Sequence, residues 1–105
     1  MKELRYTSQF KKDLKRFLNQ PKKLKALNDV LEMLRNETPL PERYRQHTLQ
    51  GNYAGCLECH IDGDFLLVWY DEVNNTIALF RLGYIPNYSR NSQSPRLMHS
   101  IGRGD

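Results

Sequence analysis

The sequence predicts an α+β fold in which two N-terminal helices pack on one face of a small, mainly antiparallel sheet. Three observations predict it. A short segment of alternating polar and apolar residues opens the chain, two amphipathic helical segments follow it, and three strand-like segments separated by turn residues occupy the second half. The 105 residues suffice for one domain. We expect that domain to span residues 1–85, with a flexible tail over residues 86–105, where no periodicity remains.

The N-terminal elements follow from the spacing of apolar residues. Residues 3–6 alternate as a short strand does, and Ser8 is placed to cap the helix that follows. The apolar stripe of this first helix consists of Phe10, Leu14, Phe17 and Leu18. Pro21 interrupts the helix, because proline does not continue one. Leucines recurring at intervals of three and four then predict a second helix over residues 22–36.

The second half of the chain predicts a β-meander. Residues 37–52 form a long loop of the kind that is often functional in a small domain. Strands are expected at Tyr53–Ile61, Phe65–Tyr70 and Ile77–Leu82. The three-residue turn Asp62-Gly63-Asp64 joins the first two as a hairpin. With both helices on one face, the other face of the sheet is left open as a candidate site.

The charge is unevenly distributed. Residues 1–50 hold 12 basic and 6 acidic residues, a net charge of +6, whereas residues 51–105 have a net charge of −2. Such a basic half suits a polyanionic partner, either a nucleic acid or an acidic protein segment, although lysine-rich helices can also be merely solvated. The residues expected to contact RNA are Lys11, Lys12, Lys15, Arg16, Arg45 and Tyr84.

Strand parity sorts the residues that could carry chemistry. On the expected strand over residues 53–61, one face is polar and is formed by Cys56, Glu58 and His60. The other is apolar and is formed by Leu57, Cys59 and Ile61. The polar face could equally be the solvent face of a half-buried sheet. Because the two thiols point to opposite faces, the pair does not form a zinc site. We predict neither a metal site nor a cofactor.

Four polar residues together would suffice to cleave RNA without a metal: His47 in the long loop, His60, Asp64 in the turn, and Arg81 on the last strand. One group would deprotonate the ribose 2′-hydroxyl, whose oxygen attacks the adjacent phosphate, and another would protonate the leaving 5′-oxygen. Histidine suits both proton transfers, because its unperturbed pKa lies near 6.5. Arginine suits the phosphate, because its planar fork of donors matches the phosphate oxygens.

The sequence resembles the YafQ-like branch of the RelE/ParE toxin superfamily. The resembling segments are Ser8-x-Phe10-Lys11-Lys12-Asp13-Leu14, Leu40-Pro41-x-x-Tyr44-x-x-His47-x-Leu49-x-Gly51, Cys59-His60-Ile61-x-x-Asp64-Phe65-Leu66-Leu67-Val68-Trp69 and Leu79-x-Arg81-x-Gly83. The resemblance implies a RelE-like fold and ribosome-dependent cleavage of mRNA. It also implies neutralisation by a cognate antitoxin, expected to offer an acidic and apolar segment. It assigns His47, His60 and Asp64 to active-site positions, Arg81 to phosphate binding, and Glu58 to a position where relatives can have an acidic residue.

The sequence departs from the family after Gly83, where a histidine is expected and Ile85 aligns. The departure leaves open a toxin with weakened cleavage, or one that only binds antitoxin or RNA. A second alternative is a ParE-type toxin that acts by binding DNA gyrase, although the set of His47, His60, Asp64 and Arg81 argues against it. We also expect a cytoplasmic protein without membrane association, because the chain lacks both a secretory signal and an apolar run of about 20 residues.

Overall fold

The computed structural model describes residues 1–84, and its elements confirm the predicted fold class. Ile85 and the expected tail over residues 86–105 lie outside the described residues. The strands are β1 (Glu3–Tyr6), β2 (His47–Thr48), β3 (Leu57–Asp62), β4 (Phe65–Asp71) and β5 (Thr76–Tyr84). The helices are α1 (Ser8–Lys15) and α2 (Pro21–Arg35), with 3₁₀ turns η1 (Glu42–Tyr44) and η2 (Gly51–Tyr53).

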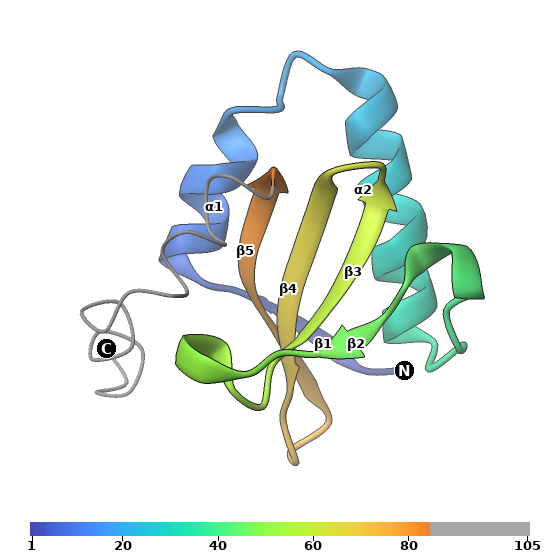
Figure 1. The fold of residues 1–105 in the computed structure, drawn as a ribbon, viewed down its shortest axis with the longest axis vertical. Helices are drawn as coiled ribbons and strands as arrows, with labels where there is room; N and C mark the ends of the chain where they lie inside the picture. The colour runs from blue at the N-terminus through green and yellow to red at the C-terminus, as the bar shows by residue number, and fades with distance from the viewer. Residues whose placement is uncertain (85–105) are drawn as a thin grey trace.

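The five strands form one sheet in the order β1-β5-β4-β3-β2 (Figure 1). Only the β1–β5 pair is parallel; the other described pairs are antiparallel. Strand β4 is the central strand. Its residues Phe65, Leu67 and Trp69 join the main core with apolar residues of both helices, which therefore cover the same face. The intervening Leu66 and Val68 pack on the opposite face in a second, smaller cluster.

The start of the first helix differs from the prediction by one residue. The N-cap is Thr7 and not Ser8, because Thr7 has the extended backbone that a cap requires, while Ser8 is already helical. The Thr7 hydroxyl accepts a hydrogen bond from the Phe10 amide at 3.1 Å and donates one to the Leu79 carbonyl at 2.7 Å. One side chain thus both caps α1 and ties it to β5.

The first helix also ends earlier than the apolar stripe predicted. Because α1 stops at Lys15, the residues that follow leave the helical period. Phe17 still enters the core, but Leu18 is 60% exposed, so its predicted place on the stripe is wrong. Pro21 occupies the first turn of α2, where its missing N–H costs nothing.

The strand predicted over residues 53–61 begins only at Leu57. Gly51 and Gly55 both have positive φ values, 69° and 92°, so the chain turns here instead of extending. Tyr53 and Cys56 fold over Leu66 and Val68 and complete the second cluster. The face of the sheet expected to be open is therefore covered at its centre. The predicted long loop likewise holds short elements of its own, η1 and the edge strand β2.

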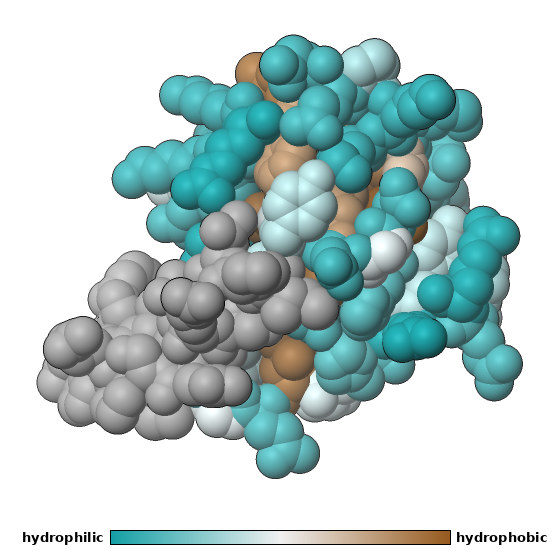
Figure 2. Space-filling view, turned by 45° about the horizontal axis from the view of Figure 1, so that its top comes forward, coloured by the Kyte–Doolittle hydropathy of each residue, from teal (hydrophilic) through white to brown (hydrophobic). Residues whose placement is uncertain are grey.

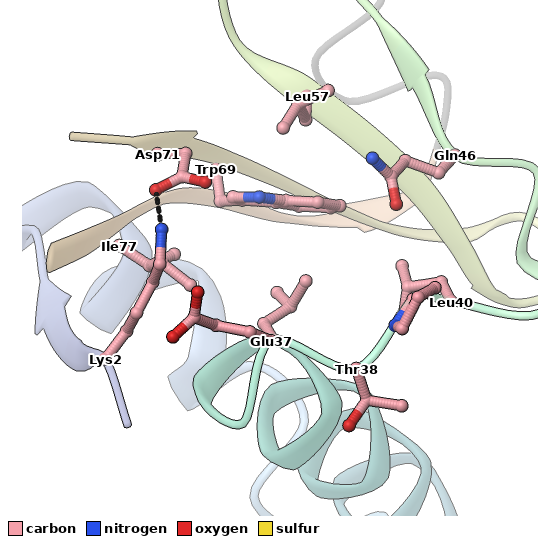
Figure 3. Close-up of a pocket in the computed structure, with 11 residues that line it drawn as sticks. Lys2, Glu37, Thr38, Leu40, Gln46, Leu57, Trp69, Asp71 and Ile77 are labelled. Atoms are coloured by element: carbon pink, nitrogen blue, oxygen red, sulfur yellow. Dashed lines mark hydrogen bonds and ion pairs between the residues drawn. The ribbon is translucent and has the colours of Figure 1, made fainter. Parts of the chain in front are cut away.

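A small cavity of about 240 Å³ lies between the end of α2 and the sheet (Figure 3). Its apolar lining, which includes Leu34, Leu57 and Trp69, belongs to the main core. At its rim, Lys2 and Asp71 form an ion pair at 2.6 Å, and the hydrogen bond to Asp71 raises the pKa of Lys2. The cavity thus lies on the helix side of the sheet.

Phe65→Ala should lower the free energy of unfolding by about 3–5 kcal/mol. Phe65 is fully buried, and its ring contacts those of Phe17 and Tyr84. Denaturant unfolding of the variant measures the loss. Val73→Ala is the control, because Val73 is fully exposed and its truncation should change stability by less than about 0.5 kcal/mol. A Phe65→Ala variant as stable as this control would contradict the packing described.

Candidate active site

Three of the predicted site residues lie on or beside one row of residues that crosses the sheet. In the strand register, His47 faces Glu58, Glu58 faces Val68, and Val68 faces Arg81. Residues facing each other on neighbouring strands project to the same side of a sheet. With strands about 4.8 Å apart, the backbone of Glu58 lies about 10 Å from that of Arg81. His60 lies two residues beyond Glu58 on β3, on the same side.

His47 is held between two acceptors. Its Nε2 lies 2.8 Å from Oε1 of Glu58, and its Nδ1 lies 2.8 Å from the carbonyl oxygen of Arg45. A carbonyl only accepts, so Nδ1 donates its proton to Arg45. Nε2 then either donates to a charged Glu58 carboxylate or accepts from a protonated one. In both cases the hydrogen bond joins His47 and Glu58 through one shared proton.

The Glu58 carboxyl lies in an environment that favours its protonated form. Its side chain is 8% exposed, while that of His47 is 48% exposed. Burial raises the pKa of Glu58, and the charges of His47 and His60 together with the hydrogen bond from His47 only partly offset the rise. Arg45, whose carbonyl holds the other side of the ring, adopts a left-handed backbone with φ 50°.

His60 lies beside this pair with one ring nitrogen occupied. Its Nδ1 lies 3.0 Å from the carbonyl oxygen of Gly63, to which it donates, and its ring centre lies 6.4 Å from that of His47. The tight turn brings the Gly63 carbonyl back to the ring, because Gly63 takes a left-handed φ of 60°. The neutral ring therefore carries its lone pair on Nε2, the nitrogen that a general base uses.

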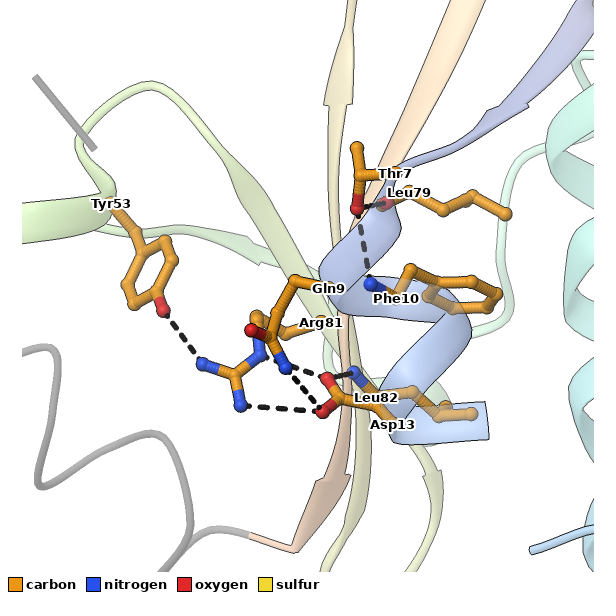
Figure 4. Close-up of polar contacts among 8 residues, drawn as sticks. All are labelled: Thr7, Gln9, Phe10, Asp13, Tyr53, Leu79, Arg81 and Leu82. Atoms are coloured by element: carbon orange, nitrogen blue, oxygen red, sulfur yellow. Dashed lines mark hydrogen bonds and ion pairs between the residues drawn. The ribbon is translucent and has the colours of Figure 1, made fainter. Parts of the chain in front are cut away.

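Arg81 is fixed by an aspartate that the sequence prediction missed (Figure 4). Its Nε donates to Oδ2 of Asp13 at 2.8 Å, and its Nη2 lies 3.4 Å from Oδ1. Its Nη1 donates to the hydroxyl of Tyr53 at 3.2 Å. The side chain of Arg81 is 14% exposed and that of Asp13 is 3% exposed. Burial lowers the pKa of Arg81, but the hydrogen bond and charge of Asp13 outweigh it, so the pKa is raised overall.

Asp13 also completes the edge of the sheet. The short strand β1 pairs with β5 only from Thr76 to Leu79. Beyond that point, the Leu82 amide donates at 2.9 Å to Oδ2 of Asp13. A sequence signal for Asp13 exists, because it lies three residues after Phe10 and four before Phe17 and so falls on the buried stripe of α1. A buried carboxylate on such a stripe requires a partner.

The other predicted site residues are more dispersed. Asp64 is exposed in the turn between β3 and β4. The basic residues expected to contact RNA are exposed; they are Lys11, Lys12, Lys15, Arg16 and Arg45. Hydrophilic side chains cover most of the face in Figure 2, with a narrow apolar strip between them. Tyr84 packs against Phe17 and Phe65, so the sheet separates it from His60.

The two cysteines lie in different clusters, Cys59 under the helices and Cys56 on the opposite face. Burial raises the pKa of Cys56 to about 11 and that of Cys59 to about 12, so both remain protonated thiols at neutral pH. Among residues 1–84, no group of three or more His, Cys, Asp or Glu side chains is arranged to hold a metal ion.

The fold is shared with a chain of a solved bacterial complex. The toxin–antitoxin complex YoeB–YefM of Staphylococcus aureus contains a chain that superposes with a TM-score of 0.65 at 22% identity, covering 80% of this chain and 97% of that one. In addition, no helix within residues 1–84 is long and apolar enough to cross a membrane.

The chain belongs to the YafQ family, described as bacterial toxins of type II toxin–antitoxin systems, which residues 2–84 match. The mRNA interferase toxin YafQ of Escherichia coli K12 is 32% identical over 69 residues, or 65% of this chain and 75% of the relative. The E. coli DinJ–YafQ complex superposes with a TM-score of 0.72 at 28% identity, covering 82% and 96% of the chains. A metal-bound toxin of Helicobacter pylori superposes with a TM-score of 0.73 at 36% identity. The match covers 80% of this chain and 94% of that one.

Glu58→Gln should make the protein more stable at pH 8 and change it little at pH 4. The folded state raises the pKa of Glu58, so folding favours the protonated form and the charged form costs stability. This cost is absent below the ordinary pKa of 4.5 and develops as pH rises through the folded value. Glutamine never ionises and therefore avoids it.

Thermal unfolding of the parent and the Glu58→Gln variant between pH 4 and pH 8 measures this difference. Glu42→Gln serves as the control, because Glu42 is an exposed glutamate in η1 and its neutralisation should leave the melting temperature unchanged. A Glu58→Gln variant that melts below its parent at pH 8 would show that the His47 ion pair outweighs the burial of the carboxylate.

Proposed function

We propose that this chain is an mRNA interferase, the toxin of a type II toxin–antitoxin system, which cleaves mRNA on the ribosome without a metal ion. The observation that carries the proposal is the row on one sheet face, in which the backbones of Glu58 and Arg81 lie about 10 Å apart, with His47 bonded to Glu58 and His60 beside it. Family membership and the activity named for the E. coli relative support it.

His60 acts as the general base in this proposal. Its Nδ1 donates to the Gly63 carbonyl, so Nε2 is the nitrogen that takes the proton of the 2′-hydroxyl. The 2′-oxygen then attacks the adjacent phosphorus, and the bond from phosphorus to the 5′-oxygen breaks. The products are a 2′,3′-cyclic phosphate and a free 5′-hydroxyl.

His47 acts as the general acid. His47 and Glu58 share a proton through their hydrogen bond, and half of the His47 side chain is exposed, so the ring can protonate the leaving 5′-oxygen. Glu58 keeps its contact with Nε2 and stabilises the protonated ring until transfer. In this proposal one histidine takes a proton and the other gives one, as acid–base catalysis requires.

Arg81 stabilises the negative charge that develops on the phosphate. Asp64 is exposed in the β3–β4 turn, and the family resemblance assigns it an active-site role. The basic side chains on α1, with Arg45, hold the RNA backbone through charge. Tyr84 stays a predicted RNA contact. It is half-buried, so only the exposed part of its side chain is available to RNA.

The proposed partners are the ribosome, mRNA and a cognate antitoxin, and the proposed location is the cytoplasm. A structure of the E. coli relative with its antitoxin DinJ supports the antitoxin. An acidic and apolar antitoxin segment would complement the basic residues of α1.

His60→Gln should lower the single-turnover rate of mRNA cleavage about 10²–10⁴-fold, because it removes the group that takes the 2′-hydroxyl proton. The assay incubates the purified chain with translating ribosomes and maps mRNA ends. His99→Gln is the matched control. His99 is the third histidine of the chain and lies outside the segments that resemble the family, so its replacement should leave the rate unchanged.

The same assay tests the rest of the proposal. Chelation of zinc, copper and manganese, with free Mg²⁺ kept for the ribosome, should leave the cleavage products unchanged. A rate restored only by one added transition metal would overturn the metal-free mechanism. A parent chain that binds ribosomes without cutting mRNA would instead indicate a toxin that acts by binding.

Co-expression with the antitoxin encoded beside the toxin should raise both the soluble yield and the melting temperature of the chain, because a ligand that binds only the folded state stabilises it. Size-exclusion chromatography of the co-expressed pair, followed by thermal unfolding, measures both effects. A pair that separates on the column, or melts no higher than the toxin alone, would contradict the proposed partner.

A further inference from the structure

We propose that Asp13 is a positioning residue of the reaction: it orients the Arg81 guanidinium so that its outer edge faces the phosphate. The inference rests on the proposed function and deepens it. Asp13 belongs to α1 and Arg81 to β5, 68 residues apart in the chain. The contact therefore exists only once the helix has packed against the sheet.

The hydrogen bonds of Arg81 divide its guanidinium into two edges. A guanidinium has five N–H groups. Asp13 takes the one on Nε and one on Nη2, and the Tyr53 hydroxyl accepts one from Nη1 (Figure 4). Within the described residues, one N–H remains on each of Nη1 and Nη2, along the outer edge. Two parallel donors in this arrangement match two oxygens of one phosphate.

Asp13 is suited to hold this orientation because it is itself fixed. Its carboxylate is buried and accepts from the Leu82 amide, so the backbone of β5 sets its position. Gln9, one turn earlier on α1, donates to the other oxygen at 3.0 Å. Without this anchor the flexible arginine side chain would sample several rotamers, and a misplaced catalytic group can cost about 10²-fold in rate.

A purely structural role, in which Asp13 only joins α1 to the edge of β5, makes a different prediction. A structural residue affects the enzyme whether or not Arg81 is present, whereas a positioning residue acts through Arg81 alone. A double-mutant cycle on the two residues separates the roles.

The experiment measures single-turnover mRNA cleavage by Asp13→Ala, Arg81→Ala and the double variant. Asp13→Ala should lower the rate about 10–100-fold in the parent and less than about twofold in the Arg81→Ala background. Asp13→Asn keeps an oxygen for Arg81 Nε and the Leu82 amide, so it should recover most of the lost rate. Asp71→Ala is the charge-matched control, because it removes one carboxylate from the exposed ion pair with Lys2 and should leave the rate unchanged.

A second readout does not depend on cleavage. In ¹⁵N spectra, the Nε–H signal of Arg81, assigned by its absence in Arg81→Ala, should be resolved in the parent and in Asp13→Asn and lost in Asp13→Ala. If Asp13→Ala does not fold, Asp13→Asn provides the test. Its neutral amide oxygen no longer forms a charge-assisted hydrogen bond with Arg81 Nε, so the Nε–H should exchange with solvent several-fold faster than in the parent.

Three results would overturn the proposal: an equal loss of rate in both backgrounds, an unchanged rate in folded Asp13→Ala, or an Nε–H signal unaffected by both Asp13 variants. A parent chain that fails to cleave would contradict the proposed function alone. In that case, affinity for a 2′-O-methyl RNA oligonucleotide takes the place of the rate in the same cycle. A loss of affinity on Asp13→Ala in the parent background alone would support the positioning role of Asp13. An equal loss in the parent and Arg81→Ala backgrounds would overturn that role.

Discussion

The central strand β4 has to be buried on both faces, and the rest of the structure depends on this constraint. Five consecutive residues, Phe65 to Trp69, are buried, and alternate side chains point to opposite sides of the sheet. The two helices cover one side. The other side is covered by a single segment around Tyr53 and Cys56, which packs on Leu66 and Val68. A sheet covered on only one side would leave these two residues in water, at a cost of about 1.5–3 kcal/mol each.

The covering segment also builds the candidate site. It packs on Val68, the residue that lies between Glu58 and Arg81 in the strand register. Tyr53 lies in the same segment, and its hydroxyl reaches the Arg81 guanidinium. The packing that completes the core therefore also places one hydrogen-bond partner of Arg81.

Both ends of the site have the same arrangement, a buried carboxyl group in contact with a more exposed basic side chain. Glu58 contacts His47, and Asp13 contacts Arg81. A buried charge is costly without a partner, so each carboxylate holds its partner firmly. The electrostatic result differs between the two ends. Burial dominates at Glu58 and raises its pKa, whereas at Arg81 the charge of Asp13 outweighs burial. The protonated, neutral form is thus favoured at Glu58, and the protonated, charged form at Arg81.

The sequence by itself determined the fold class, the two helices and the β-meander, because these follow from local periodicity and from turn residues such as Gly63. It also selected His47, His60, Asp64 and Arg81 as candidates. Only the tertiary structure decided that Asp13 meets Arg81 and that His47 is held by both Glu58 and the Arg45 carbonyl. It also turned Tyr53 and Cys56 from an expected strand into a cover for the sheet. The local sequence around each of these residues does not identify its contact partner. The contacts depend on strand register and helix packing, which a local pattern does not reveal.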